Sequence, residues 1–548
     1  MAARLNSSLH NALCLLKPFN TLLTTKPFSP RNSFRFSKKL ASSPRRALHS
    51  TSTLESHENG ERFVLSTPLY YVNAPPHMGS AYTTIAADSI ARFQMGLLIH
   101  SLTSLGSGTD EHGEKIATSA AANGRNPADH CDLNSQSYRS LWKELDIAHD
   151  MTRLYCINCE EYKDEKELLE NSCCPVHQMP CVARKEDNYF FALSKYQKQL
   201  EEVLSQNPLF VQPSYRLNEV KSWIKSGLRD FSISRALVDR GIPVPDDDKQ
   251  TIYVWFDALL GYISALAEDN GQQNLDTAVS LGWPASLHLI GKDILRFHAV
   301  CWPAMLMSAG LSLPKMVFGH GFLTKDGMKM GKSLGNTLEP FELVQKFGPD
   351  AVTYFFLREV EFGNDGDYSE DWFIKIVNAH LANTIGNLLN RRRTVEKAKT
   401  NYESLSLSTV CEAVLEIGNA GNSYMDQRAP WMLFKQGGVS AEAAAMDLVI
   451  ILEVMRIIAV ALSPVAPCLS LRIYSQLGYS VDQFNSITWG DTKWGGLKGG
   501  QVMAQANPVF ARIELSAEKD EEEKKVKDSN KKGKAKVKVE KPQAVAEA

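Results

Sequence analysis

Residues 62–93 read RFVLSTPLYYVNAPPHMGSAYTTIAADSIARF, and the pattern of apolar residues changes once within them. The first part, RFVLSTPLYYV, is rich in β-branched and aromatic residues, which is typical of a buried strand. The next four residues, NAPP, break the strand, and a helical pattern then runs from Met78 to Phe93. A strand, a tight turn and a helix form the opening of a nucleotide-binding α/β fold. We therefore expect a parallel sheet that begins here.

A second unit of this kind lies at Leu287 to Ala309, LHLIGKDILRFHAVCWPAMLMSA. Between the two units lie a cysteine cluster and a polar stretch that ends near Arg240, so we expect an insertion that interrupts the α/β domain. After Asp371 the pattern turns helical. Apolar residues at steps of three and four predict one buried helical face. These residues are Phe373, Ile376, Val377, Leu381, Ile385, Leu388 and Leu389.

The helical region also contains a long apolar stretch. Leu448 to Val465 carries Glu453 and Arg456, which predicts a buried helix rather than a membrane span. We expect a central helix over 443–462.

The expected divisions of the chain are a transit peptide at 1–58, the first catalytic half at 59–113, a zinc-containing insertion at 114–240, the second catalytic half at 241–325, a signature loop and stem-contact region at 326–370, an all-α domain at 371–515 and a charged tail at 516–548.

The composition indicates a chain of several domains. Its 548 residues are 44% hydrophobic and 22% charged, as in ordinary globular proteins. The formal net charge of −2 neither predicts nor excludes a nucleic-acid partner, because a local basic face suffices. The tail from Ser516 is nearly all Lys, Glu, Asp and small residues, so we expect it to be disordered, with weak RNA contact as the alternative.

The N-terminus has the composition of an organelle transit peptide. Its first 54 residues contain no Asp or Glu but nine Lys or Arg and nine Ser. The alternative is a disordered basic arm that binds RNA. We expect cleavage between Ser50 and Glu58 and location in the mitochondrion, the chloroplast or both.

Five of the ten cysteines lie between Cys156 and Cys181. The pairs Cys156-x-x-Cys159 and Cys174-Pro-Val-His177, separated by a loop, fit a tetrahedral structural zinc site. Cys173 and Cys181 are alternative ligands. Free buried cysteines are the other interpretation.

Two short motifs lie at loops where phosphate chemistry is possible. His77-Met78-Gly79-Ser80 opens the first helix, where Gly79 lets a nucleotide approach and the helix N-terminus can face phosphate. Lys329-Met330-Gly331-Lys332-Ser333 forms a glycine-containing cationic loop that can stabilise charge on a triphosphate. Each motif alone is common, and the first can be a structural turn and the second a solvated loop. The second lacks the glycine spacing of a Walker loop.

Taken together and in this order, the two motifs resemble the HIGH and KMSKS signatures of class I aminoacyl-tRNA synthetases. Further stretches narrow the resemblance to the methionyl-tRNA synthetase family of the organellar and bacterial type, over about residues 60 to 515. These stretches are Tyr70-Tyr71-Val72-Asn73, Gly108-Thr109-Asp110-Glu111-His112-Gly113, Val254-Trp255-Phe256-Asp257-Ala258, Ile290-Gly291-Lys292-Asp293, Phe297-His298 and Trp302-Pro303-Ala304.

The resemblance implies a Rossmann-type catalytic domain with a zinc-containing insertion, followed by an all-α anticodon-binding domain. It implies a methionine–tRNA ligase that uses ATP with Mg²⁺, binds L-methionine and tRNA(Met), carries a structural Zn²⁺ and spans no membrane. Its carboxylate substrate attacks the α-phosphate of ATP directly, so catalysis rests on positioning and electrostatics. The oligomeric state cannot be read from the sequence.

The resemblance also implies roles for individual residues. The catalytic residues are His77, Gly79, Lys329 and Lys332, and ATP is held in addition by Ser80, Asp293 and Ser333. Methionine is bound by Asp110, through its amino group, and by Leu69, Tyr71, Trp255, Ala258, Tyr262, Phe297, His298 and Trp302. Aromatic walls suit a polarisable thioether. Without the resemblance, the same aromatic residues would be taken as part of an ordinary hydrophobic core. The anticodon is bound by Asn387, Arg391 and Trp431, which otherwise read as a packed or solvated helix face. Zinc is bound by Cys156, Cys159, Cys174 and His177.

The sequence departs from the family in several places. Ser80 replaces the second His of HIGH, and Gly331 replaces the first Ser of KMSKS, at positions where the family varies. Met95 to Ser107 fits poorly, since a regular apolar strand normally precedes the Thr-Asp-Glu-His stretch. The connection between Asp150 and Leu154 is shorter than the family's, which indicates missing residues.

Two other interpretations remain at this point. Synthetases for valine, leucine or isoleucine carry a larger editing insertion, for which there is no room, and a cysteine enzyme places zinc in its pocket. A noncatalytic RNA-binding relative is disfavoured by the intact lysine pair, His77 and Asp110.

Overall fold

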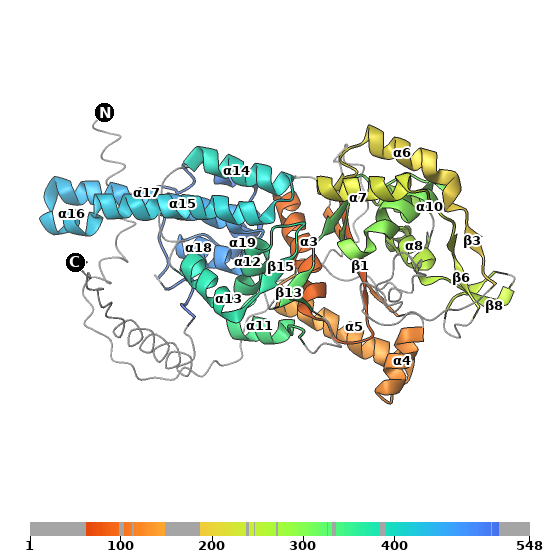
Figure 1. The fold of residues 1–548 in the computed structure, drawn as a ribbon. Coiled ribbons are helices and arrows are strands. Elements are labelled where there is room, and N and C mark those ends of the chain that lie inside the picture. Colours follow the sequence, from red (N-terminus) through yellow and green to blue (C-terminus); the bar gives the residue numbers. More distant parts are fainter. Residues whose placement is uncertain are drawn as a thin grey trace, which may run out of the picture.

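The computed structural model describes residues 62–97, 103–111, 114–147, 187–236, 241–245, 247–269, 272–273, 275–325, 327–330, 336–382, 391–505 and 507–513. An α/β body occupies one end of the elongated molecule and a helical body the other (Figure 1). Within the described part of the chain, no helix combines the length and the apolar character that crossing a membrane requires.

The α/β body is built on a five-stranded parallel sheet. Its order is β2 (Thr103–Asp110), β1 (Phe63–Tyr71), β11 (Leu287–Gly291), β12 (Val317–His320) and β4 (Val211–Gln212). β11 (LHLIG) and β12 (VFGH) are mostly apolar because helices cover the sheet, whereas β2 reads TSLGSGTD. The predicted strand at 62–72 and the predicted second unit are both confirmed.

Helices connect and cover these strands. They are α3 (Met78–Leu97), α4 (Glu114–Ala122), α5 (Pro127–Glu144), α6 (Gln197–Gln206), α7 (Ser214–Lys225), α8 (Val254–Ala267), α9 (Leu275–Ser280) and α10 (Trp302–Ser308). A π-helical turn, Phe297–Cys301, precedes α10. The predicted helix from Met78 is therefore α3, which extends four residues beyond Phe93.

Short strands form small sheets at the edges of the body. β3 (Phe190–Phe191) pairs with β5 (Phe231–Ser232), and β8 (Asp247–Ile252) pairs with both β6 (Ser234–Arg235) and β7 (Pro243–Val244). β9 (Glu268–Asp269) pairs with β10 (Gln272–Gln273). β13 (Leu323–Lys325) lies between β14 (Met328–Lys329) and β15 (Gly366–Tyr368).

Parts of the expected insertion belong physically to the main body. In α5 the ring of Tyr138 stacks on Tyr70 of β1 with centroids 5.4 Å apart. Asn134 Nδ2 donates to the carbonyl oxygen of Val72 over 2.8 Å. β4 pairs with β12 at the edge of the main sheet. The division of the chain at residues 114 and 240 stays a prediction, and α5 and β4 pack as catalytic core.

The second body is helical, as predicted. Its elements are α11 (Pro340–Phe347), α12 (Pro349–Glu359), α13 (Glu370–Val377), α14 (Arg391–Glu403), α15 (Leu407–Arg428), α16 (Pro430–Gln436), α17 (Gly438–Leu462), α18 (Pro467–Gln476) and α19 (Val481–Asn485). A π-helical turn, Asn378–Ala382, follows α13, and a 3₁₀ turn, Trp489–Thr492, follows α19. Phe373, Ile376, Val377 and Leu381 are buried as expected, and Ile385, Leu388 and Leu389 lie outside the described residues.

The predicted central helix is α17, and most of its second half is buried. It begins five residues before the predicted Ala443, directly after Gly437, whose φ of 72° marks the turn out of α16. The two charges within it form a buried pair, since Arg456 Nη2 lies 2.8 Å from Glu453 Oε1. Glu453 also accepts the backbone N–H groups of Gly495, Gly496 and Leu497, which fastens the C-terminal segment to the helix.

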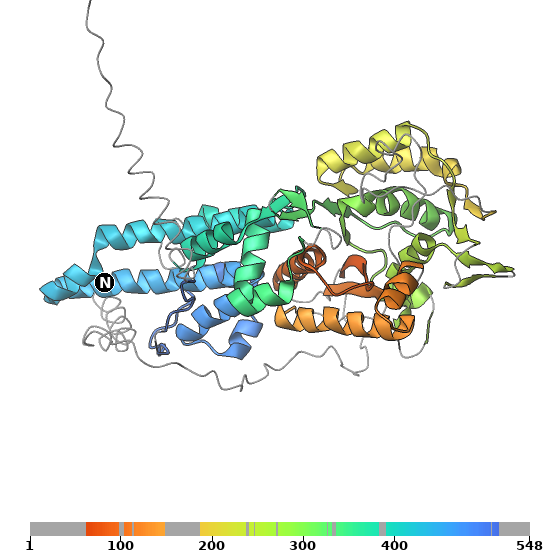
Figure 2. The same ribbon diagram turned by 60° about the horizontal axis from the view of Figure 1, so that its bottom comes forward.

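The two bodies meet at α3. The ring of Phe93 stacks on Tyr402 of α14 with centroids 4.4 Å apart, and its edge meets Trp489. All three rings are apolar surfaces that water would otherwise cover, so their burial holds the bodies together. Figure 2 shows the ribbon of the two bodies from a second side, with α3 next to the helical body.

Candidate functional site

The sequence signatures gather at one edge of the parallel sheet. β1, β2, β11 and β12 run in the same direction, so their carboxyl ends lie together. Tyr71 pairs in register with Asp110, and Gly291 pairs with His320. Ligands of open α/β sheets bind at this edge. The structure therefore brings together the ends of the strands that carry the predicted site.

The first signature forms a tight helix start at the end of β1. The carbonyl oxygen of His77 accepts the N–H groups of Ser80 and Ala81. Ser80 Oγ in turn accepts the N–H of His77 over 3.2 Å and donates to its carbonyl oxygen over 2.8 Å. This reciprocal pattern is a variant of a capping box. It gives Ser80 a local reason to replace the family's second His.

Gly79 lies close to the ring of His77. A Cβ atom at this position would lie 3.0 Å from two ring atoms of His77, closer than ordinary contacts. A side chain at this position would require the His77 ring to shift by a few tenths of an ångström. The glycine thus leaves an open backbone at the positive end of α3, where phosphate is favoured.

The second signature lies close to the first. The N–H of Met78 donates to the carbonyl oxygen of Leu338, five residues after the second motif ends at Ser333, over 3.0 Å. Lys329 lies in β14, although its side chain lies outside the described part of the chain, as do Lys332 and Ser333. The described backbone that follows the second motif therefore contacts the helix start that carries His77.

The third group at this edge follows β11 and β12. Asp293 is exposed and lies two residues after Gly291. A Cβ atom added to Gly291 would lie 2.5 Å from Asp293 Oδ1. His320 Nδ1 faces the carbonyl oxygen of Gly321 over 2.7 Å and must carry the proton, so Nε2 accepts from Thr83 Oγ1, also over 2.7 Å. Burial lowers the pKa of His320, which keeps it neutral. Sequence reasoning missed His320 and Thr83, since 237 residues separate them.

The predicted amino-acid pocket is assembled from β1, α8 and the segment before α10. Trp255 and Phe297 stack with centroids 4.3 Å apart at an interplanar angle of 7°. Leu69, Tyr71, Trp255 and Ala258 pack around one small cluster with Tyr253 and Val254. Tyr262, Phe297, His298 and Trp302 are buried beside them, in the neighbouring core.

Two polar side chains of this pocket, Tyr262 and His298, are paired within the protein, whereas among the described residues the buried indole N–H of Trp255 has no hydrogen-bond partner. His298 Nδ1 lies 2.9 Å from the carbonyl oxygen of Ile294 and carries the proton, so Nε2 accepts from the hydroxyl of Tyr262 over 2.7 Å. Burial lowers the pKa of His298 to about 4. Burial raises the pKa of Asp257, in the first turn of α8, to about 6. The paired rings of Tyr262 and His298 thus present neutral aromatic surfaces, which suit an apolar, polarisable side chain.

The remaining predicted residues lie partly or wholly outside the part of the chain that the structure describes. Asp110 ends β2, and Arg391 begins α14, but their side chains lie outside the described part. Asn387, Cys156, Cys159, Cys174 and His177 lie outside the described residues altogether. Among the described residues, no group of three or more His, Cys, Asp or Glu side chains is arranged for a metal ion.

Trp431 lies at the far end of the helical body, on α16 beside the start of α17 (Figure 1). Its side chain is 47% exposed. Ala429, two residues before it, has a φ of 40°, and this left-handed turn lets α16 leave α15 at an angle. An exposed indole at such a tip can stack on an unpaired base.

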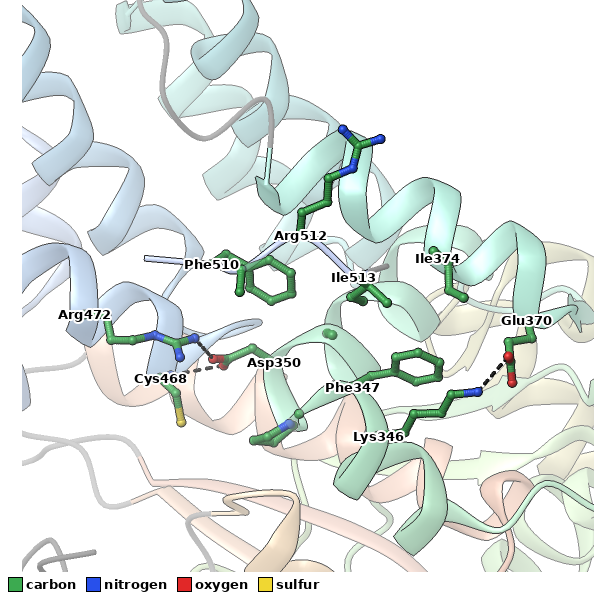
Figure 3. Close-up of a pocket in the computed structure, with 14 residues that line it drawn as sticks. Lys346, Phe347, Asp350, Glu370, Ile374, Cys468, Arg472, Phe510, Arg512 and Ile513 are labelled. Carbon is green, nitrogen blue, oxygen red and sulfur yellow. Dashed lines mark hydrogen bonds and ion pairs between the residues drawn. The ribbon is translucent and has the colours of Figure 1, made fainter. Parts of the chain in front are cut away.

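A cavity of about 760 Å³ lies apart from the strand ends, between α11, α12, α13, α18 and residues 510–513. Figure 3 shows Asp350 between Arg472 and Cys468 on one side, and the Lys346–Glu370 ion pair on the other. Asp350 accepts the N–H of Cys468 over 3.1 Å and so caps α18. The signature residues are not among those that line this cavity.

Comparison with known proteins gives a consistent result. Residues 63–154 and 151–393 match the family described as tRNA synthetases class I (M), and residues 379–530 match the anticodon binding domain of methionyl tRNA ligase. The chain is 74% identical to the chloroplastic/mitochondrial methionine–tRNA ligase of Arabidopsis thaliana, over 100% of both chains. It is 44% identical to the methionine–tRNA ligase of Synechocystis, over 83% of this chain and 98% of the relative.

A solved structure agrees with these relatives. Mycobacterium tuberculosis methionyl-tRNA synthetase in complex with methionyl-adenylate superimposes with a TM-score of 0.75 at 32% identity. The match covers 83% of this chain and 100% of that one.

The alignments also bear on the short connection. The alignment with the Arabidopsis protein spans 620 positions, 72 more than the 548 residues of this chain. The two matches to the class I family meet at residues 151–154, where the connection was expected to be too short. Both observations support a chain that lacks part of the insertion present in this relative.

Proposed function

Because this chain belongs to the methionine-specific family of class I tRNA synthetases, we propose a residue-by-residue account of its reaction. The chain is a methionine–tRNA ligase of organellar protein synthesis. It uses ATP to convert L-methionine to methionyl-adenylate and then charges tRNA(Met). The observation that carries the account is the meeting of four parallel strand ends at one sheet edge, with Tyr71 paired in register to Asp110 and with the His77 helix start following β1.

In the first step the methionine carboxylate attacks the α-phosphorus of ATP, and pyrophosphate leaves. Asp110 pairs with the methionine ammonium group, a charge-assisted contact at the end of the strand beside Tyr71. The aromatic pocket around Trp255, Tyr262 and Trp302 takes the thioether. Together these contacts hold the carboxylate in position for attack, which supplies much of the rate.

ATP lies along the helix start and the lysine loop. His77 and Gly79 face its phosphates at the positive end of α3, with Ser80 shaping the turn. Asp293 contacts the ribose. Lys329, Lys332 and Ser333 hold the departing pyrophosphate, where negative charge develops in the transition state. Mg²⁺ accompanies the triphosphate as part of the substrate.

In the second step a hydroxyl of the terminal adenosine of tRNA attacks the adenylate carbonyl carbon, and AMP leaves. Asn387, Arg391 and Trp431 bind the anticodon at the other body. The exposed indole of Trp431 supports this role. Recognition and chemistry therefore use separate surfaces of one chain.

The assignment of Asp110 is tested by Asp110→Asn. Losing a charge-assisted contact should raise the KM for methionine in pyrophosphate exchange by about 10- to 100-fold, with little change in the KM for ATP. Asp129→Asn, an exposed carboxylate in the first turn of α5, is the matched control. An unchanged methionine KM in Asp110→Asn removes the residue from the pocket.

We also propose a structural zinc held by Cys156, Cys159, Cys174 and His177. Three thiolates and one imidazole form a donor set typical of closed, four-coordinate zinc sites. Metal analysis of freshly purified protein should give one zinc per chain, and Cys156→Ser with Cys159→Ser should remove it. A wild-type protein without zinc would refute the site.

The N-terminal 58 residues serve in this account as a transit peptide. The lack of acidic residues in the first 54 positions and the organelle name of the Arabidopsis relative support this role. A fusion of residues 1–60 to a fluorescent reporter should enter a chloroplast or mitochondrion. A reporter that stays in the cytosol overturns the targeting role.

The shortened insertion should affect the second step more than the first. The residues assigned to methionine and ATP lie outside the break at 151–154, whereas the insertion guides the acceptor end of tRNA in this family. Filling the gap with the corresponding segment of the Arabidopsis relative should raise the thermal midpoint and the charging rate, and change pyrophosphate exchange less. Equal charging by the present and filled chains would show that the segment is dispensable.

A further inference from the structure

One buried histidine next to the pocket has no role in the account above. His288 lies in β11, in the middle of the main sheet, and is fully buried. It pairs in register with Ser66 of β1, three residues before Leu69. A bulge in the pairing of β1 with β2 separates Ser66 from Leu69. His288 thus lies on the strand next to β1, which supplies Leu69 and Tyr71 to the pocket.

The hydrogen bonds of His288 determine its tautomer. The indole N–H of Trp302 points at Nε2 over 3.3 Å, and an indole nitrogen can only donate. Nε2 must therefore be the bare acceptor, and the ring proton lies on Nδ1. Nδ1 is 2.5 Å from Ser66 Oγ, to which it donates. Both nitrogens are then used, one toward β1 and one toward α10.

The surroundings of the ring keep it neutral. The ring centroid of Tyr262 lies 4.5 Å away, and those of His298 and Trp283 lie 6.2 and 6.4 Å away. Burial, and then the neighbouring His298, lower the pKa of His288 well below its ordinary value. A protonated ring could not accept from Trp302, so the neutral form preserves the contact.

We propose that His288 is a positioning residue for methionine: by accepting the indole N–H of Trp302 and donating to Ser66, it fixes the aromatic wall of the pocket against β1. The inference rests on the proposed assignment of Trp302 and Tyr262 to that pocket. His288 does not touch the substrate in this account. It acts by setting the orientation of two rings that do.

The alternative is an ordinary core histidine whose loss only weakens the fold. The two cases differ because Trp302 is fully buried. Without its acceptor, the indole N–H is left unpaired in the core, and the ring must turn or strain. A turned Trp302 changes the shape of the methionine pocket but leaves the nucleotide edge, at His77 and Asp293, in place.

The test compares two substitutions that each keep one of the two hydrogen bonds. In His288→Asn the amide nitrogen can take the place of Nδ1 and donate to Ser66, but no acceptor reaches Trp302. In His288→Gln the longer side chain carries its oxygen toward the position of Nε2. Methionine affinity is measured on the full chain by calorimetry, and ATP affinity is measured separately.

We expect His288→Asn to weaken methionine binding about tenfold, the effect of one unpaired buried donor, with ATP binding unchanged. His288→Gln should recover part of that loss. In a Trp302→Phe background, which has no indole N–H, His288→Asn should cause little further loss. His380→Asn is the control, since this half-buried histidine bonds Tyr354 in the helical body.

Two results would overturn the inference. One is wild-type methionine affinity in His288→Asn, and the other is full additivity of His288→Asn with Trp302→Phe. If His288→Asn does not fold, Ser66→Ala and His288→Gln decide in its place, with an unchanged methionine affinity in both counting against the role. An unchanged affinity in Trp302→Phe itself would instead refute the pocket assignment, which separates the two failures.

Discussion

The amino-acid pocket and the Trp431 tip differ in how complete they are before any substrate arrives. In the pocket, the Tyr262 hydroxyl and both nitrogens of His298 are already paired within the protein. At the tip of the helical body, the indole of Trp431 is about half exposed. The fold already pairs the Tyr262 and His298 side chains of the first site, whereas the second site presents an exposed ring to a partner.

The difference follows from the size of the two substrates. A small amino acid is discriminated by a cavity, which needs rigid walls and satisfied polar groups. A base of an RNA loop is recognised by stacking on an exposed ring, which gains its contacts only in the complex. The two sites also lie in different bodies of the molecule (Figure 1). Substitutions at one should therefore spare the other.

The largest effect is expected at the catalytic end, from Lys332→Ala. Losing a charge that stabilises the departing pyrophosphate should lower the turnover of pyrophosphate exchange by about 100-fold or more. The KM for methionine should change little, because the lysine acts mainly in the transition state. Lys498→Ala, an exposed lysine in the C-terminal segment, is the control. Unchanged turnover in Lys332→Ala would remove the loop from the mechanism.

Trp431→Ala is expected to have a smaller effect, on the charging of tRNA rather than on pyrophosphate exchange. Loss of one stacked base should reduce kcat/KM for charging tRNA(Met) by about 10- to 100-fold. Pyrophosphate exchange should stay at the wild-type level, since it needs no tRNA. Trp494→Ala removes another half-exposed tryptophan from the same body and serves as control. Equal loss of both activities in Trp431→Ala would indicate a folding role instead.

The smallest effect on either activity is expected from Asp350→Asn, beside the cavity in Figure 3. Burial raises the pKa of Asp350 to about 6, above its ordinary value, although Arg472 opposes the shift. Because the folded state holds the proton more tightly, wild-type stability should fall as the pH rises from about 4 to about 6, by at most about 3 kcal/mol.

The amide of the variant stays neutral and can still accept the N–H of Cys468. Its thermal midpoint should therefore lack the wild-type decline over this pH range, while both activities stay unchanged at neutral pH. Asp350→Ala, which also loses the cap of α18, should be less stable than Asp350→Asn. Parallel pH profiles of the wild type and Asp350→Asn would contradict the raised pKa.

Local patterns predicted much of the fold. The change from strand to helix at residues 62–93 appears in the structure as β1 and α3. The poorly fitting stretch before Asp110 still forms β2, because parallel pairing with β1 uses backbone groups. Helix limits were less accurate, as in α17, whose start depends on the turn at Gly437.

Contacts between distant residues could not be predicted in the same way. Ser66 and His288 are 222 residues apart, and His288 is the one polar side chain of β11, whereas Ser66 precedes Thr67 in β1. Such a residue signals only that some partner exists, since a buried polar group must be paired. The packing of α5 on β1 was likewise hidden, because its residues looked like part of an insertion. The motif residues were found by resemblance, which local patterns alone would not have supplied.

The central claim is that the pocket of Trp255, Tyr262, His298 and Trp302 selects methionine for activation by ATP. The most direct test is amino-acid-dependent exchange of labelled pyrophosphate into ATP, measured with the full chain and each of the standard amino acids in turn. The account predicts strong exchange with methionine alone. Equal exchange with leucine or valine would contradict it.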